Sequence, residues 1–109
     1  MSRYFRMEVA ISDHLPQNIA AMQKAAEEEW PFEDWRECAG EWVSDGEGNL
    51  CGGETDDEFA ERLSKAVWRA NGAFCKVCVR AFFLEELPVE DHCLGKADYE
   101  RLMGQPGQP

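Results

Sequence analysis

The chain has 109 residues, of which 44% are apolar, so it is long enough for one domain and too apolar for a disordered chain. Acidic residues outnumber basic ones 22 to 11, and the net charge of −11 argues against direct binding of nucleic acid. No apolar run approaches the roughly 18 residues that a membrane-spanning helix needs, so we expect no membrane contact.

The chain opens with a predicted strand and a predicted helix. Residues 3–11 alternate between apolar and polar side chains, which is typical of a half-buried strand. From Leu15 to Trp30, apolar residues recur at helical spacing and form one stripe. Pro31 ends this helix, because proline disfavours helical geometry in the residue before it.

A β-hairpin is predicted next. We expect a second strand over 35–44, a turn over 45–49 and a short third strand over 50–54, because the glycines of the turn tolerate a positive φ. Trp35 and Trp42 stand an odd number of residues apart. A regular strand would therefore point them to opposite faces and leave one of them exposed.

A second helix and a long strand are predicted in the second half of the chain. Thr55 and Glu58 form a capping-box pattern at the helix start, and Asn71 with Gly72 supplies its stop. Residues 73–84 then alternate clearly and form the best-defined strand of the chain.

The order of these elements predicts the fold class. Strand, helix, strand, strand, helix, strand is the split βαβ, or ferredoxin-like βαββαβ, pattern, with two helices on one face of a mainly antiparallel sheet. We expect a single α+β domain over residues 1–103, with a short helix over 96–103 as its C-terminal extension and a flexible tail over 104–109. A hairpin appended to a three-stranded sheet is the alternative.

Most of the negative charge is concentrated in residues 27–61, which hold fourteen acids and one base, Arg36. Aromatic residues are interleaved with these acids, which is not typical of a disordered acidic tail. The region is either a solvated, solubilising face or a surface shaped for a basic partner. The candidate partner-binding acids are Glu27, Glu28, Glu29, Glu33, Asp34, Glu37, Glu41, Asp45, Glu47, Asp56, Asp57, Glu58 and Glu61.

Trp68 completes the set of candidate partner-binding residues. On the second helix it lies about 180° from Phe59, away from the apolar face, so it is a candidate contact anchor. The alternative is that Trp68 packs under the C-terminal segment 88–103.

No complete catalytic or metal-binding motif is present. Because the N-terminus lacks a secretory segment, we expect a cytoplasmic location and reduced thiols. We expect no metal, no cofactor and no enzymatic activity, since His14 and His92 lack a nucleophile–base arrangement and are expected to be solvated. The cysteines, an odd number that cannot all pair within one chain, are Cys38, Cys51, Cys75, Cys78 and Cys93.

The charge of residues 27–61 suggests a function. Thirteen excess negative charges on one flank approach the charge density of a DNA duplex, which carries one charge per roughly 1.7 Å. Such a flank would compete with nucleic acid for the basic groove of a host protein or nucleoprotein complex. The alternatives are a small ferredoxin-like enzyme with His92 or Cys93 in a cleft, and a structural adaptor that forms homodimers.

A resemblance adds to this hypothesis. The small size, the acidity and the segment 52–59 resemble uncharacterised small proteins of phages and mobile elements. The profile is also similar to that of anti-CRISPR proteins, several of which act as acidic DNA mimics. The resemblance covers about half of the chain and carries no residue-specific motif. It implies a non-enzymatic, anti-CRISPR-type inhibitor that occupies the basic nucleic-acid-binding surface of a host complex.

Overall fold

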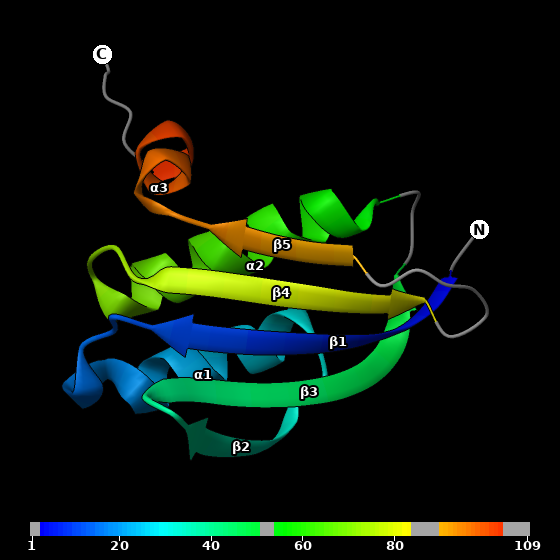
Figure 1. The fold of residues 1–109 in the computed structure, drawn as a ribbon, viewed down its shortest axis with the longest axis horizontal. Helices are drawn as coiled ribbons and strands as arrows, with labels where there is room; N and C mark the ends of the chain where they lie inside the picture. The colour runs from blue at the N-terminus through cyan, green and yellow to red at the C-terminus, as the bar shows by residue number, and fades with distance from the viewer. Residues whose placement is uncertain (1–2, 51–53, 84–89, 104–109) are drawn as a thin grey trace.

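The structure, a computed structural model, describes residues 3–50, 54–83 and 90–103. Its strands form one sheet in the order β2-β3-β1-β4-β5, and every neighbouring pair is antiparallel (Figure 1). β2 and β5 are therefore the two edges of the sheet. The strands are β1 (Arg3–Ser12), β2 (Glu33–Cys38), β3 (Glu41–Leu50), β4 (Lys76–Phe83) and β5 (Glu90–Leu94).

Two helices cover one face of this sheet (Figure 1). A single 3-10 turn, η1 (Pro16–Asn18), leads into α1 (Ile19–Glu29), which packs beside α2 (Asp56–Asn71). A third helix, α3 (Lys96–Met103), contacts both β5 and α2. The opposite face of the sheet has no helix over it in the described ranges. In the same ranges, every helix is too short or too polar to cross a membrane.

The core lies between the sheet and the two covering helices. Met7 and Ile11 of β1 and Val77 of β4 are fully buried, and they meet Phe59 and Leu63 of α2 in one apolar cluster. Their chain neighbours on each strand point to the uncovered face, as the period of two requires. The predicted alternation of the first and the fourth strand is therefore confirmed.

Both ends of α2 are as the sequence predicts. The Glu58 backbone N–H donates to the Thr55 hydroxyl at 3.2 Å, and the Thr55 N–H donates to the Glu58 carboxylate at 3.0 Å. Gly72 follows the helix with a φ of 77°, in the left-handed region that favours glycine. The end of α1 before Pro31 and the position of α3 over residues 96–103 are also confirmed.

The hairpin turn predicted over 45–49 is wrong. The chain turns at Ala39 and Gly40, whose φ angles of 54° and 84° are both positive, as a type I′ hairpin turn requires. Residues 45–49 instead lie inside β3. Leu50, predicted to begin a third strand over 50–54, is the last residue of β3, and residues 51–53 of that prediction lie outside the described part of the chain.

Close packing explains Gly46 inside β3. A Cβ atom on Gly46 would lie 2.1 Å from the backbone oxygen of Pro31, because the chain leaving α1 passes directly over this strand. The Trp30 indole Nε1 donates a hydrogen bond to the Gly46 carbonyl at 2.8 Å. A glycine in a strand interior often marks such a close approach of another segment.

The predicted separation of Trp35 and Trp42 is also wrong. Their rings are stacked, with centroids 6.4 Å apart and planes at 14°. The hairpin turn lies between them, so they belong to neighbouring strands, and a register shift between Glu33 and Arg36 bends β2. The Trp35 indole donates to the Glu27 carboxylate of α1 at 2.8 Å, which places the pair on the helix side of the sheet.

β5 is an element that the sequence pattern did not predict. It extends the expected four-stranded sheet to five strands, so the mixed α+β class and the antiparallel sheet are confirmed while the number of strands is corrected. The segment 84–89, where we expected the fourth strand to end, and the tail 104–109 lie outside the described residues.

A disulfide joins the two strands at this edge. Cys78 and Cys93 are directly opposite in the β4–β5 register and are bonded to each other, with Cα atoms 4.0 Å apart. The expectation of reduced thiols is therefore wrong for this pair. Cys38 is free and exposed, Cys75 is free and buried, and Cys51 lies outside the described residues.

We expect Cys38 and Cys75 to differ sharply in reactivity. Burial, with a contribution from Asp13, raises the pKa of the Cys75 thiol to about 12, so almost no thiolate forms near neutral pH. Iodoacetamide at about pH 8 should alkylate Cys38 in the folded protein and leave Cys75 unmodified, as read by peptide mass spectrometry. Labelling in denaturant is the control, and equal rates for both cysteines in the folded protein would contradict the expectation.

Candidate functional site

The structure divides the fourteen acids of residues 27–61 into separate groups. One group lies at the end of α1 and on β2 and β3, at one edge of the sheet (Figure 1). A second group lies on the first turns of α2, which contacts β5 at the other edge. We name the first group the β2-edge surface. It consists of Glu27, Glu28, Glu33, Asp34, Glu37, Glu41, Asp45 and Glu47.

The expectation of one coherent acidic surface is wrong for the remaining six acids. Arg62 of α2 forms ion pairs with Glu29 and, at 2.8 Å, with Glu54, and these carboxylates raise the pKa of its guanidinium. Arg101 of α3 lies 3.3 Å from Glu61. The others are Asp56 and Asp57, which face the two ring nitrogens of His92, and Glu58, which completes the helix cap.

The β2-edge surface keeps its negative charge. Its single ion pair among the described residues joins Arg36 to Asp45 across 3.9 Å. Glu27 does accept a hydrogen bond, but from the neutral indole of Trp35. Eight carboxylates and the Arg36 guanidinium sum to a charge of −7. Arg6 of β1 lies beside four of these acids but is ion-paired with Glu8, so the Arg6–Glu8 pair adds no net charge.

β2 also has no neighbouring strand on its outer side within the described sheet. It is an edge strand, and all of its side chains except the half-buried Trp35 are exposed. Asp34 has a φ of 59°, and the irregular register beside it bends the strand. Charge and irregularity at an edge both oppose pairing with a further strand.

A hollow of about 390 Å³ lies beside the β2-edge surface, between η1 and the β2–β3 turn. Two polar atoms of its lining residues, Trp42 Nε1 and His14 Nδ1, are buried and have no hydrogen-bond partner in the described part of the chain. A buried polar group without a partner is destabilising by about 1–3 kcal/mol, so a ligand that supplied one would be favoured. The lining residues are Asp13, His14, Pro16, Ile19, Glu37, Gly40 and Trp42.

This hollow was missed by sequence reasoning. Its lining comes from the loop after β1, from the start of α1 and from the β2–β3 hairpin, so no local spacing marks it. The unpaired indole of Trp42 has no sequence signal either, because hydrogen-bond partners are set by the folded neighbours.

Trp68 does not belong to any surface. Its side chain is 1% exposed, so the expectation of an exposed contact anchor is wrong. The ring meets Tyr99 of α3 edge-on, with centroids 5.1 Å apart, and its Nε1 donates to the Cys75 carbonyl at 2.7 Å. The alternative considered from the sequence, packing under the C-terminal segment, is therefore confirmed.

The uncovered face of the sheet carries a second hollow, of about 420 Å³. Charges along it are balanced within the chain. Arg80 lies 2.8 Å from Asp91 and 3.9 Å from Glu8. Glu41 and Arg36 of the β2-edge surface also line this hollow, so that surface reaches the uncovered face, while the arginine on the β4–β5 side of the hollow is paired.

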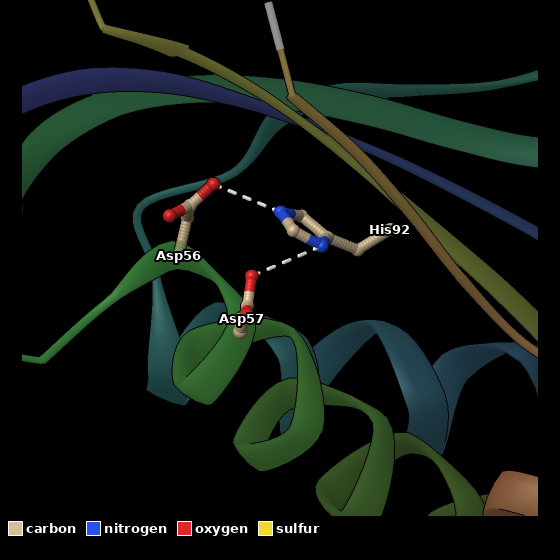
Figure 2. Close-up of side chains that lie close together, drawn as sticks. All are labelled: Asp56, Asp57 and His92. Carbon is tan, nitrogen blue, oxygen red and sulfur yellow. Dashed lines mark hydrogen bonds and ion pairs between the residues drawn. The ribbon is translucent and has the colours of Figure 1, made fainter.

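His92 was expected to be solvated, which is wrong, because its side chain is only 17% exposed. It points from β5 toward the first turn of α2, where Asp56 and Asp57 face its two ring nitrogens (Figure 2). The sequence contains no sign of this group, since His92 and the aspartates are brought together only by the packing of α2 against β5.

Comparison with known proteins found no matching family model, no matching curated protein and no matching solved structure.

Proposed function

We propose that the chain is a non-enzymatic binding protein whose β2-edge surface occupies the basic nucleic-acid-binding surface of a host protein or nucleoprotein complex. The observation that carries the proposal is the concentration of eight carboxylates, with one ion pair among the described residues, on adjoining parts of α1, β2 and β3. Unneutralised charge of one sign on a rigid surface attracts an oppositely charged partner and speeds the encounter.

The charge density indicates which nucleic acid the surface imitates. β3 has 10 residues and is about 34 Å long at about 3.4 Å per residue. A net charge of about −7 along it is one charge per roughly 5 Å, whereas a duplex carries one per roughly 1.7 Å and each of its strands one per roughly 3.4 Å. We therefore propose that the surface imitates a single phosphate backbone and not a whole duplex.

Contacts beside the acids support binding of a basic peptide segment. The hollow next to the surface is lined by the carboxylates of Asp13 and Glu37 and by the half-buried ring of Trp42. Carboxylates and an aromatic face together suit an arginine or lysine side chain. The unpaired Trp42 N–H would then donate to a backbone carbonyl of the same partner segment.

The resemblance to anti-CRISPR proteins makes a nucleic-acid-guided effector complex the first host partner to test. Such a partner implies a cytoplasmic location, where the Cys78–Cys93 disulfide would have to persist against cellular reductants. We also propose that α1, α2 and the first four strands form a ferredoxin-like unit to which β5 is added. The βαββαβ order of these elements supports this.

Removing charge from the β2-edge surface should abolish partner capture. We would neutralise Glu28→Gln, Asp34→Asn and Glu37→Gln together, because all three side chains are exposed and none forms an ion pair in the described part of the chain. The unchanged chain should retain basic nucleic-acid-binding proteins from host lysate at about 50 mM salt, and duplex or single-stranded DNA should displace them. The triple variant should retain at least about tenfold less.

A second triple variant controls for net charge. Glu58→Gln, Asp91→Asn and Glu100→Gln remove the same number of charges from exposed positions on α2, β5 and α3. Glutamine at residue 58 still completes the capping box. Capture by this control should stay within about twofold of the unchanged chain. Equal losses in both variants, or capture that about 500 mM salt does not weaken, would refute the proposed surface.

A further inference from the structure

We propose that His92 and Asp57 bind a zinc ion at the junction of β5 and α2, with Asp56 orienting the imidazole ring. Each of the three residues offers one potential ligand atom, and these atoms lie within 4.8 Å of one another. This site is separate from the β2-edge surface, at the opposite edge of the sheet, and does not depend on the proposed function.

The hydrogen bond between His92 and Asp56 selects the tautomer that a metal needs. His92 Nε2 lies 2.8 Å from Asp56 Oδ2, and the carboxylate is 19% exposed, so the ring N–H donates to a partly buried acceptor (Figure 2). That leaves the Nδ1 lone pair free on the other side of the ring. Histidines that bind metals almost always donate their second ring N–H to a carboxylate or carbonyl in this manner.

The free nitrogen faces a second carboxylate. His92 Nδ1 and Asp57 Oδ1 are 3.4 Å apart (Figure 2). A lone pair and a carboxylate oxygen at this separation repel each other unless a cation lies between them. Zinc binds nitrogen and carboxylate oxygen at about 2.0–2.2 Å, which separates two ligands of a tetrahedral ion by about 3.4 Å. The two atoms therefore already have the spacing of zinc ligands.

The surroundings favour a cation and leave room for the rest of its shell. Asp57 and His92 line a hollow of about 320 Å³ that Asp56 does not reach, which fits its orienting role. Glu61 stands one helical turn beyond Asp57 and lines the same hollow, but its carboxylate lies 3.3 Å from the Arg101 guanidinium and would have to leave that ion pair to bind the metal. The acids that line this hollow are Asp57, Glu61, Asp91 and Asp98. Asp91 pairs with Arg80, and Glu61 and Asp98 pair with Arg101, so Asp57 is the acid of this hollow that has no arginine partner among the described residues.

The ligand types point to zinc. An imidazole nitrogen with carboxylate oxygens suits a borderline metal, whereas magnesium and calcium prefer oxygen ligands alone. With few protein ligands, water would complete the shell, as in open zinc sites. The positive end of the α2 dipole opposes a cation by about 0.3–1 kcal/mol, and the carboxylates of Asp56 and Asp57, which face His92, offset this.

Calorimetric titration of the full chain with zinc chloride tests the proposal, after iodoacetamide has blocked the accessible thiols. We expect one zinc per chain. Asp57→Asn and His92→Gln should each weaken binding at least tenfold, and Asp56→Asn should weaken it about 10- to 100-fold, as is usual for an orienting carboxylate. Glu58→Gln, in the same helical turn, and His14→Gln, at the other histidine, should leave the affinity within about twofold.

A nitrogen NMR spectrum of His92 separates zinc binding from simple protonation. Zinc should shift the Nδ1 resonance to a metal-bound position while Nε2 stays protonated. A doubly protonated ring at saturating zinc would overturn the proposal, as would the absence of binding at 1 mM zinc, or binding that survives Asp57→Asn. Because the Asp57 side chain is 74% exposed, this variant folds even if His92→Gln does not, and the test stays decisive.

Discussion

Replacing Trp68 by alanine should lower the free energy of unfolding by about 3–5 kcal/mol, the range for deleting a large aromatic side chain from a core. Trp68 is fully enclosed by α2, the chain after it and α3. The substitution leaves a cavity and also leaves the Cys75 carbonyl without its donor. Urea unfolding followed by far-ultraviolet circular dichroism measures the change.

Trp68→Phe is the matched variant. It keeps an aromatic ring against Tyr99 but removes the Nε1–H that donates to the Cys75 carbonyl. The loss should be about 1–3 kcal/mol, smaller than for alanine, because the main change is one buried acceptor without a partner. A Trp68→Ala protein as stable as the unchanged chain would show that α3 does not cover this ring.

Gly46→Ala should destabilise the fold by about 3 kcal/mol, at the upper end of what overpacking produces. The new Cβ would lie 2.1 Å from the Pro31 oxygen and 2.8 Å from its carbonyl carbon, and both are backbone atoms that cannot rotate away. Accommodating the methyl group requires β3 or the α1–β2 connection to move, which would also strain the Trp30–Gly46 hydrogen bond.

Gly48→Ala is the control in the same strand. Its Cβ would lie 3.4 Å from side-chain atoms of Trp30 and Pro31, which is close to ordinary contact. We expect the free energy of unfolding to change by no more than about 1 kcal/mol, because the added methyl group alters backbone freedom and packing only slightly. Equal stability of the two alanine variants in urea unfolding would contradict the close approach of Pro31 to β3.

The two errors in the hairpin share one cause. Gly46 and Gly48 lie in a segment whose composition is typical of a turn. Composition alone does not distinguish a glycine in a turn from a glycine against which another segment packs closely. The actual turn, Ala39–Gly40, has a weaker signal because alanine is uncommon at positive φ. Once the turn is misplaced, Trp35 and Trp42 fall on one strand in the prediction and on two in the structure.

The sequence shows how many acids residues 27–61 contain, but the prediction that they form one surface was wrong. Except for Glu29, the acids of residues 27–47 do share one edge, because consecutive elements of the chain lie side by side there. The acids of residues 54–61 lie elsewhere, because α2 packs on the β4–β5 side of the sheet (Figure 1). Their cations, Arg62 and Arg101, come from parts of the chain whose positions only the packing of the helices determines.

The amino-acid sequence was enough to predict the features that depend on neighbours along the chain. These are the alternation of β1 and β4, the capping box of α2, its stop at Gly72 and the total charge. The packing of the folded chain was needed to see that Trp68 is covered, which acids have no ion-pair partner, and that His92 meets Asp56 and Asp57. Those features depend on pairs of residues far apart in the chain, whose contacts form only when the sheet and helices pack together.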